Sequence, residues 1–295
     1  YWLSKFDHDI QILNMPTVYE RPSIINHIGN SIYDSLENSR QIDKFCQKNG
    51  VTPYMFLLAC FYVLLYKYTM QEDIVVGSPV SGRTMSEFAN TIGMFVNTLA
   101  LKENLTSQDS FSDFLSRLKN NCIESFSHQN YPFDELVKVL NIKHDSSRNP
   151  LFDIMFSFES SGMPSLDFNN LKTSYVIPEN KTSKFDISME ITPITNENDK
   201  KYQIRVEYLS SLYNDIFIKD FIDCYKNIIL NVIDNPDIMI GKISMCPQDM
   251  ISLVEMYPKL DYPKDRIIID LFNEQVNKNP NKIALYFGNQ KFTYK

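Results

Sequence analysis

Apolar residues recur at helical spacing in several segments of the first 240 residues. The strongest segment is residues 54–68, which are apolar on nearly every side. Thr52 and Pro53 precede it and are typical of a helix N-cap and a first helical position. This segment is predicted to be the central helix of the core. The same periodicity predicts further helices at residues 35–47, 111–118, 133–140 and 214–232.

Extended patterns alternate with these helices and then dominate the middle of the chain. Residues 74–80 are branched apolar side chains that end at a polar loop, which indicates a buried strand, and residues 99–101 are expected to belong to a second. A weaker strand pattern covers residues 23–28. Partly alternating segments separated by polar turns predict more strands, at residues 151–159, 171–177, 184–191 and 202–209. The expected fold class is α/β, with an antiparallel or mixed sheet packed against helices.

The regular spacing of apolar residues weakens towards the C-terminus and returns after residue 262. Residues 241–262 hold short apolar stretches among Pro, Ser and Asp without sustained periodicity, and we interpret them as a linker after a first domain at residues 1–240. Residues 263–295 contain a predicted helix at 265–276 and a predicted hairpin that begins with a strand at 283–287. Because one helix and two short strands bury too little apolar surface to fold alone, this second domain is expected to be truncated.

Composition narrows the class of partner. The formal net charge is -7 and the basic residues form no block, so a nucleic-acid surface is not expected. The five cysteines lack the close pairs of zinc sites and small disulfide frameworks, so they are expected to be reduced, and no metal site is predicted. The N-terminus has no signal-peptide pattern, and the most apolar run, residues 55–65, is far shorter than the ~20 residues of a membrane span. The cytoplasm is the expected location, with no membrane partner.

Three motifs carry a resemblance to a known family. They are IGMFVNTLAL at residues 92–101, HQNYPFDELV at 128–137 and SSRNPLFDIMF at 146–156, in order and at suitable spacing. Together with EDIVVGSPVSGR at 72–83 and the opening YWL, they resemble the C-terminal lobe of the condensation domains of nonribosomal peptide synthetases. After the expected linker, YPKDRIIIDLFNEQVNKNPNKIALYFGNQKFTYK resembles the start of an adenylation domain, the enzyme that follows a condensation domain in an elongation module.

The resemblance implies a chloramphenicol-acetyltransferase-like fold, in which two similar α/β lobes enclose a tunnel. In that family, upstream and downstream peptidyl carrier proteins dock at the two ends of the tunnel. Each presents a thioester on 4'-phosphopantetheine, so no cofactor is expected to bind this chain directly. The acceptor amine attacks the donor thioester and a peptide bond forms. The implied partners are the two carrier proteins, the N-terminal lobe and an adenylation domain in cis.

The catalytic motif of that family is missing from this sequence. In the family, an HHxxxDG motif lies in the N-terminal lobe, and its second histidine orients or deprotonates the acceptor amine. No HHxxxDG occurs here, and the histidines are isolated: His8, His27, His128 and His144. The opening YWL matches the region where the family passes into its C-terminal lobe, so we interpret the N-terminal lobe as removed. No catalytic residue is therefore assigned, and the chain is expected to be inactive alone.

Four residues of the matched motifs are candidates for lining the substrate tunnel or contacting the pantetheine arm. Gly93 would allow close backbone approach to a substrate, with a bulge or strand entry as the alternative. Asn97 is a candidate partner for a pantetheine amide, although buried asparagines often satisfy nearby backbone groups instead. Ser81 and Arg83 follow a strand end, where loops carry function. Arg83 is a candidate for pairing with the carrier's phosphate, but a structural ion pair is the favoured interpretation.

Other residues of the motifs are given structural roles. His128 is a residue type suited to general-base catalysis, but no nucleophile or orienting carboxylate accompanies it at a recognisable spacing. Arg148 is expected to anchor a loop through hydrogen bonds to backbone carbonyls. Most aromatic residues are expected in the core. The family's crossover between lobes corresponds to residues 157–184, and without a partner lobe it is expected to be disordered or borrowed by a neighbouring molecule.

Alternative functions stay open at this point. One is a module that docks carrier proteins without catalysis. Another is an acetyltransferase of the same fold that acts on a free small molecule, and the adenylation-like tail weakens it. Epimerising and cyclising relatives share the fold, and the histidine motif that helps to tell them apart is missing. IGMFVNT and HQNYPFD favour ordinary condensation.

Overall fold

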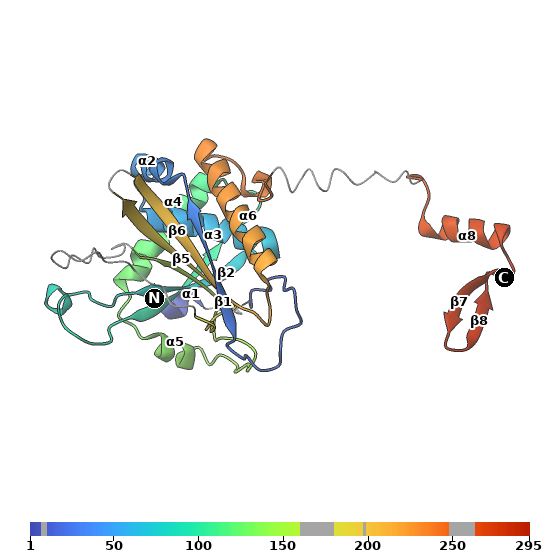
Figure 1. Cartoon of the computed structure of the whole chain (residues 1–295), viewed down its shortest axis with the longest axis horizontal. Helices are drawn as coiled ribbons and strands as arrows, with labels where there is room; N and C mark the ends of the chain where they lie inside the picture. Colours follow the sequence, from blue (N-terminus) through green and yellow to red (C-terminus); the bar gives the residue numbers. More distant parts are fainter. Residues whose placement is uncertain (7–10, 160–179, 197–198, 248–262) are drawn as a thin grey trace, which may run out of the picture. The chain divides into compact units, whose positions relative to one another are not determined.

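The computed structural model describes residues 1–6, 11–159, 180–196, 199–247 and 263–295. The chain divides into two compact units, Tyr1–Pro247 and Gln248–Lys295. The first unit contains a mixed sheet with helices, and the second contains a helix and a hairpin (Figure 1). The candidate tunnel residues all belong to the first unit.

A six-stranded sheet forms the framework of the first unit, with the strand order β1-β6-β5-β4-β2-β3. Its strands are β1 (Gly29–Leu36), β2 (Asp73–Val80), β3 (Asn97–Asn104), β4 (Ile154–Phe158), β5 (Ile187–Asn196) and β6 (Asp199–Leu209). β4 runs parallel to both of its neighbours, β2 and β5, whereas the other pairs are antiparallel. The sheet is therefore mixed, as the sequence allowed.

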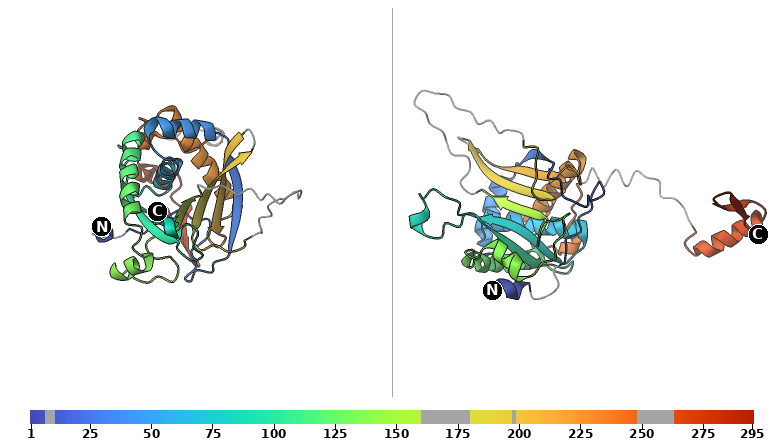
Figure 2. Two further views of the ribbon diagram at one scale, coloured as in Figure 1. Left: turned by 90° about the vertical axis from the view of Figure 1, so that its left-hand side faces the viewer. Right: turned by 90° about the horizontal axis from the view of Figure 1, so that it is seen from below.

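The long helices of the first unit cover one face of this sheet (Figure 2). The α-helices are α1 (Trp2–Lys5), α2 (Ser39–Asn49), α3 (Pro53–Thr69), α4 (Phe111–Ser127), α5 (Phe133–Val139) and α6 (Asp215–Asp234), and the short 3-10 turns are η1 (Ser86–Phe88) and η2 (Ile240–Lys242). Side-chain caps fix where the main helices begin. The Thr52 hydroxyl accepts the backbone N–H of Met55 at 3.2 Å, and the Asn214 amide oxygen accepts that of Phe217 at 2.9 Å.

α3 is the centre of the core, as its sequence pattern predicted. Residues 55–66 are all buried, and the helix packs against α2, α4, α6 and β2. The ring of Phe61 lies 5.3 Å from the ring of Phe156 on β4, measured between centroids. The buried hydroxyl of Tyr62 donates to the carbonyl oxygen of Leu101 at 2.8 Å. Aromatic side chains therefore contribute much of the core around α3, where the Tyr62 hydroxyl is paired, whereas the buried Tyr213 hydroxyl has no partner among the described residues.

The first strand and the first long helix are displaced from their predicted positions. A strand was expected at residues 23–28, whereas β1 begins at Gly29 and continues to Leu36. The helix predicted from Ser35 begins at Ser39 instead. All of β1 pairs antiparallel with β6 in one continuous register. This pairing between segments distant in sequence overrides the local helical pattern. The strand predicted at 171–177, with most of the expected crossover, lies outside the described residues.

The first unit continues past residue 240, where the first domain was expected to end. The backbone N–H of Gly241 donates to the carbonyl oxygen of Ser107 at 2.9 Å. The Lys67 ammonium donates to the Gly241 carbonyl oxygen, also at 2.9 Å. Residues 241–247, the first part of the expected linker, therefore belong to the first unit, because they pack on it.

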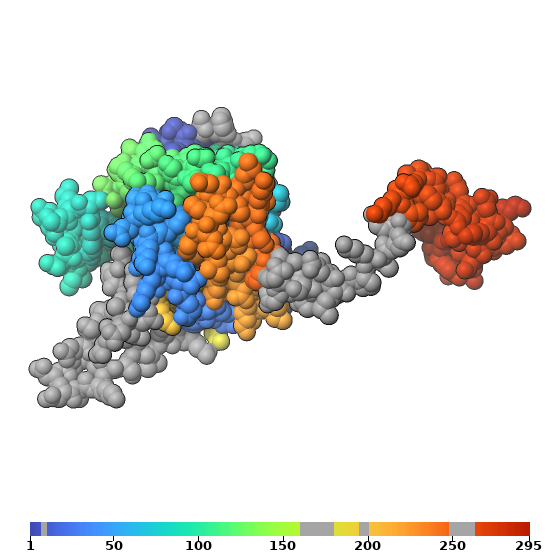
Figure 3. Space-filling view, turned by 90° about the horizontal axis from the view of Figure 1, so that it is seen from above, coloured from blue at the N-terminus to red at the C-terminus, as the bar shows by residue number. Residues whose placement is uncertain are grey.

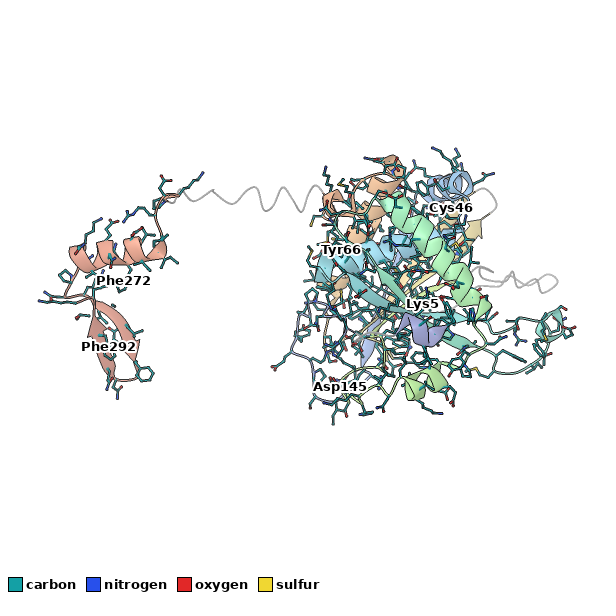
Figure 4. All side chains as sticks on the ribbon, turned by 180° about the vertical axis from the view of Figure 1, so that it is seen from behind. Lys5, Cys46, Tyr66, Asp145, Phe272 and Phe292 are labelled. Carbon is teal, nitrogen blue, oxygen red and sulfur yellow. The ribbon has the colours of Figure 1, made fainter. Side chains whose placement is uncertain are left out.

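The second unit has the predicted helix and hairpin. Its elements are α8 (Ile268–Lys278), β7 (Ile283–Phe287) and β8 (Gln290–Thr293), and the two strands are antiparallel. The ring of Phe272 on α8, labelled in Figure 4, lies 5.5 Å from that of Tyr294. Many apolar side chains remain uncovered by the described residues, with Ile268 84% and Phe287 74% exposed. Within the described residues, this unit has little apolar core of its own.

Three general features bear on the class of protein. In the part of the chain that the structure describes, no single helix is long and apolar enough to cross a membrane, and α2 and α3 pass such a test only as a pair bent by 103°. No group of three His, Cys, Asp or Glu side chains among the described residues is placed to hold a metal ion. The five cysteines are free thiols, and four of them are buried.

Candidate functional site

The loop between β2 and β3, residues 81–96, projects from the body of the first unit, and we call it the arm (Figure 3, in teal). The antiparallel pairing of β2 with β3 ends at the base of the arm, where Val80 lies opposite Asn97. Ser81, Arg83 and Gly93 are on the arm, and Asn97 is the first residue of β3. The structure therefore brings the four candidate tunnel residues to one part of the molecule.

Glycine is required where the arm leaves β2. Gly82 has a φ of +65°, and a Cβ atom there would lie 1.8 Å from the carbonyl oxygen of Phe95. Only glycine accommodates both the left-handed backbone and this close approach. Gly93 is exposed further along the arm, where an added Cβ would lie 3.1 Å from Cε2 of Phe95. The two sides of the arm are therefore in close contact near its base.

Arg83 holds the arm together from within. Its guanidinium donates to the carbonyl oxygen of Phe88 and, at 2.8 Å, to that of Thr91. The same group lies 4.4 Å from the centroid of the Phe95 ring, a cation–π contact. The backbone N–H of Arg83 donates to the Ser81 hydroxyl at 3.4 Å. Among the residues that the structure describes, Arg83 therefore binds carbonyl oxygens and an aromatic ring in place of the favoured ion pair. A guanidinium suits such partners because it offers five donors in a planar fork.

Four large apolar side chains of the arm are exposed. Ile92 is 100% exposed and Met94 is 92% exposed, while Met85 and Val96 are each 58% exposed. Large apolar side chains that gather without cover mark an interaction surface on a folded protein. The arm therefore combines a base that requires glycine at position 82 with apolar side chains that the described residues of this chain leave exposed.

Asn97 fastens the base of the arm to the loop before α5. Its amide nitrogen donates to the carbonyl oxygens of Gln129 and Tyr131 at 2.7 and 2.8 Å. Its amide oxygen accepts the backbone N–H of Phe133 at 3.2 Å. Both amide N–H groups are thus used within the protein. Asn97 therefore satisfies neighbouring backbone groups, which is the alternative role considered in the sequence analysis. Through these bonds it joins the IGMFVNT and HQNYPFD motifs.

His128 is held by local contacts beside a surface cavity of about 530 Å³ whose lining includes Trp2 and Tyr131. Its ring stacks on that of Tyr1, with centroids 4.3 Å apart, and its carbonyl oxygen accepts the Trp2 indole N–H at 3.1 Å. His128 Nδ1 lies 2.9 Å from the Glu124 carbonyl oxygen. These contacts support the structural role expected for His128, since they tie α1 to the C-terminal end of α4.

A buried carboxyl group, which sequence reasoning missed, lies behind α1. Glu103 on β3 is 4% exposed, and its two carboxylate oxygens accept the Asn121 amide at 3.1 and 2.9 Å. Lys5, labelled in Figure 4, donates to the Asn121 amide oxygen at 3.0 Å. Burial raises the pKa of Glu103 to about 7. The sequence signal that could have revealed it is the alternation of buried positions along the strand. Leu101 and Leu105, which lie two residues to either side of Glu103, are also buried.

The SSRNPL motif is anchored by an ion pair. Arg148 lies 2.6 Å from the carboxylate of Asp153, and the two side chains are 17% and 5% exposed. The backbone N–H of Asn149 donates to the same carboxylate at 3.0 Å, and its side chain donates to the Lys184 carbonyl oxygen at 2.9 Å. Arg148 therefore anchors its loop as expected, but through a carboxylate and not through backbone carbonyls.

Comparison with known proteins identifies the family. The family model for the condensation domain matches residues 1–251. Gramicidin S synthase 2 of Brevibacillus brevis is 36% identical over 300 residues, which cover 100% of this chain and 7% of that protein. Tyrocidine synthase 3 of Brevibacillus parabrevis is 36% identical over 301 residues, covering 100% of this chain and 5% of that protein. The chain belongs to the condensation domain family, as its motifs indicated.

Solved structures share the fold at low sequence identity. A four-domain nonribosomal peptide synthetase bound to AMP and glycine matches with a TM-score of 0.78 and 20% identity, covering 99% of this chain and 23% of that one. The condensation domain of the Monacolin K polyketide synthase matches with a TM-score of 0.69 and 21% identity, covering 81% of this chain and 57% of that one. The mixed α/β fold expected from the sequence is confirmed, and the chain spans only a small part of its curated relatives.

Proposed function

We propose that residues 1–247 form the C-terminal lobe of a condensation domain that joins two carrier-bound aminoacyl or peptidyl thioesters. One observation carries this proposal. The condensation domain of the Monacolin K polyketide synthase aligns with 81% of this chain, but the chain covers only 57% of that domain. A two-lobed domain of which this chain supplies one lobe accounts for that difference in coverage.

The proposed reaction forms a C–N bond and breaks a C–S bond. The acceptor amine attacks the donor thioester carbonyl, the pantetheine thiol leaves, and the amine gives up a proton. In this chain, Asn97 and His128 are the motif residues closest in type to a positioning or basic group. Both make hydrogen bonds within the lobe, Asn97 to Gln129 and His128 to Glu124. The group that takes the proton is therefore proposed to belong to the other lobe, and this chain is proposed to be inactive alone.

The arm is the proposed contact with that other lobe. Ile92 and Met94 are almost fully exposed, and burying them against a second apolar surface is favourable. The internal bonds of Arg83 hold the arm in shape before contact, so less conformational entropy is lost on association. The arm would then form part of the tunnel boundary on the side of the partner lobe.

Carrier proteins, upstream and downstream, are the proposed sources of the two substrates. Each would present its thioester on 4'-phosphopantetheine, so the cofactor stays attached to the carrier and not to this chain. Ser81, Arg83 and Gly93 remain the proposed contacts along its path, since all three lie on the arm. Asn97 is proposed to act one step away, by holding the arm against the loop that begins with His128.

Residues 263–295 are proposed to be the N-terminal part of an adenylation domain joined in cis. The exposed apolar side chains of α8 and β7, among them Ile268 and Phe287, would be covered by the rest of that domain. The alignment with a four-domain synthetase extends over 99% of this chain, which supports the order of the two domains.

A reconstitution assay tests the proposal. Two carrier proteins loaded with different amino acids are incubated with this chain, with a separately expressed partner lobe containing HHxxxDG, or with both, and the dipeptidyl thioester is measured by mass spectrometry. Product is expected only when both lobes are present. Product from this chain alone would overturn the assignment of the base to the other lobe, and epimerised starting thioester without dipeptide would indicate an epimerising relative.

A further inference from the structure

The cavity of about 530 Å³ beside His128 lies between α1 and the loop that leads from α4 into α5. Most of its lining is aromatic or aliphatic, with Trp2, Tyr131 and Leu136 among the residues that form it. None of the described side chains in this lining is Asp, Glu, Lys or Arg. A concave apolar site without charged side chains suits a neutral ligand that has an apolar part.

α1 forms one wall of the cavity and is held on α4. The Trp2 indole N–H donates to the His128 carbonyl oxygen at 3.1 Å. The hydroxyl oxygens of Tyr1 and Ser125 lie 2.7 Å apart, within hydrogen-bond distance. This wall is therefore set before a ligand binds. His128 supports it with a backbone carbonyl, which any residue at that position would supply.

The loop at residues 129–132 forms the opposite wall, and Asn97 holds it. The Asn97 amide donates to the carbonyl oxygens of Gln129 and Tyr131 at 2.7 and 2.8 Å. These bonds use the backbone of the loop and leave its side chains available, and the Tyr131 side chain is 42% exposed. They also place the cavity next to the base of the arm, where the candidate tunnel residues lie.

Asn130 supplies the polar group for a ligand. It is an exposed residue in the lining, and among the described residues no partner holds its side-chain amide. The neighbouring Ser127 hydroxyl, in contrast, already donates to the Glu124 carbonyl oxygen at 2.7 Å. A primary amide carries donors and an acceptor side by side, so it can pair with both the C=O and the N–H of a peptide group.

We propose that this cavity binds an apolar residue of an aminoacyl or peptidyl chain. The apolar side chain packs against Trp2, Tyr131 and Leu136, and an amide group of the chain pairs with Asn130. The source of this ligand, a carrier-bound thioester, rests on the proposed function. The cavity then makes Tyr131 a specificity-determining residue, because a glycyl group has no side chain to place in it.

A titration followed by nuclear magnetic resonance tests binding on the full chain. The sequence contains one tryptophan, so the ¹⁵N-labelled protein has one indole N–H signal, which belongs to Trp2. N-acetyl-leucinamide is expected to shift this signal in a saturable way, with a Kd on the order of 1 mM for so small a ligand. N-acetylglycinamide is expected to bind at least about tenfold more weakly. Free leucine should not bind, because its two charges find no charged side chain in the described lining.

Matched variants locate the binding. Tyr131→Ala and Asn130→Ala are each expected to weaken N-acetyl-leucinamide at least about fivefold. Tyr33→Ala is the control, because Tyr33 on β1 is also 42% exposed but lies outside this cavity, and it should leave the Kd unchanged. A signal that does not move at roughly ten times the expected Kd would overturn the site. Equal Kd values for Tyr131→Ala and Tyr33→Ala would overturn it as well.

Reconstitution tests the assignment to the substrate. With both lobes present, leucyl-loaded carriers are expected to react in preference to glycyl-loaded ones, and Tyr131→Ala should lower that preference about tenfold. An unchanged preference would overturn the substrate assignment, as would displacement of N-acetyl-leucinamide by the partner lobe alone. The titration needs neither carriers nor a partner lobe. A saturable titration without any dipeptide in the reconstitution would therefore contradict the proposed function and still support the cavity as an amide-binding site.

Discussion

The side chain of Asn97 reaches across to Phe133: its amide oxygen accepts the Phe133 backbone N–H at 3.2 Å. This contact joins the base of the arm to the first residue of α5, and the amide nitrogen adds bonds to two carbonyl oxygens of the same loop. The IGMFVNT and HQNYPFD motifs, separated in the sequence, are therefore one structural element. Asn97 acts on the arm by fixing its base.

Asn97→Ala is expected to lower the free energy of unfolding by about 2 kcal/mol, because it leaves backbone groups of the loop without partners. Urea denaturation followed by circular dichroism measures the change. Asn104→Ala is the matched control on the same strand, since the Asn104 side chain makes an exposed bond to Asp73. It is expected to change stability by less than about 0.5 kcal/mol. Equal losses for the two variants would contradict the role given to Asn97.

The buried Glu103 makes the stability of the first unit depend on pH. Burial raises its pKa to about 7, above the value of 4.5 expected in the unfolded chain, so the folded state favours the protonated carboxyl. The stabilisation from this group is complete below about pH 4.5 and is lost as the pH rises through about 7. Glu103→Gln keeps the shape without the charge. At about pH 9 it is expected to unfold with a free energy higher than wild type by about 3 kcal/mol.

The measurement is urea unfolding of both proteins at about pH 5 and about pH 9, where the difference between them is expected to be small at the lower pH. Glu124→Gln is the control, because the Glu124 side chain is 53% exposed. It should leave the pH dependence close to that of wild type. If the unfolding free energies of Glu103→Gln and wild type change in parallel between these two pH values, Glu103 is already ionised in the folded protein at the lower pH, and the prediction is contradicted.

The base of the arm depends on glycine at position 82. Gly82→Ala forces a Cβ atom towards the Phe95 carbonyl oxygen in a left-handed backbone, so the arm is expected to open. Opening exposes the peptide bond after Arg83, and the rate of tryptic cleavage there is expected to rise about tenfold or more. Gly288→Ala is the matched control, because Gly288 has a similar φ of +60° but nothing within 4 Å of an added Cβ. Cleavage after Arg83 should not change in that variant.

The apolar part of the arm is expected to bind the partner lobe. Met94→Asp places a charge at a position that would be buried on association, and it should weaken the complex of the two lobes by about tenfold or more. The fold of this lobe should be unaffected, since Met94 is 92% exposed. Ile216→Asp on α6 is the control, as Ile216 is 70% exposed away from the arm. Titration calorimetry measures the affinity of each variant for the separate partner lobe. Equal affinities of Met94→Asp and Ile216→Asp would argue against the arm as the contact.

The main features of the fold could be predicted from local pattern. α3 follows from its continuous apolar run and its Thr52 cap, and β2 from a short branched run. β1 was misplaced because its position depends on pairing with β6, which no local pattern records. The end of the first unit was set too early for the same reason, since residues after 240 are held by bonds to Ser107 and Lys67.

The sequence predicted where the candidate site residues lie better than it predicted which groups they bind. The motifs indicated where Arg83 and Asn97 would lie. Arg83 binds carbonyl oxygens of its own arm, and Asn97 binds those of the loop before α5, and neither set of backbone partners can be identified from side-chain types. For Arg148 the partner was within reach of sequence reasoning. Asp153 is only a few residues away, but backbone carbonyl groups were expected as the partners instead. Glu103 was missed because a charged residue in an alternating strand is usually assumed to face water.

The location of the catalytic base is the central claim, and one pair of variants tests it most directly. With both lobes and two loaded carriers present, dipeptidyl thioester formation is measured for His128→Ala in this chain and for alanine at the second histidine of HHxxxDG in the partner lobe. The account predicts near wild-type product for His128→Ala and a loss of at least about a hundredfold for the partner variant. Loss of product with His128→Ala in a lobe that still folds and binds its partner would contradict it.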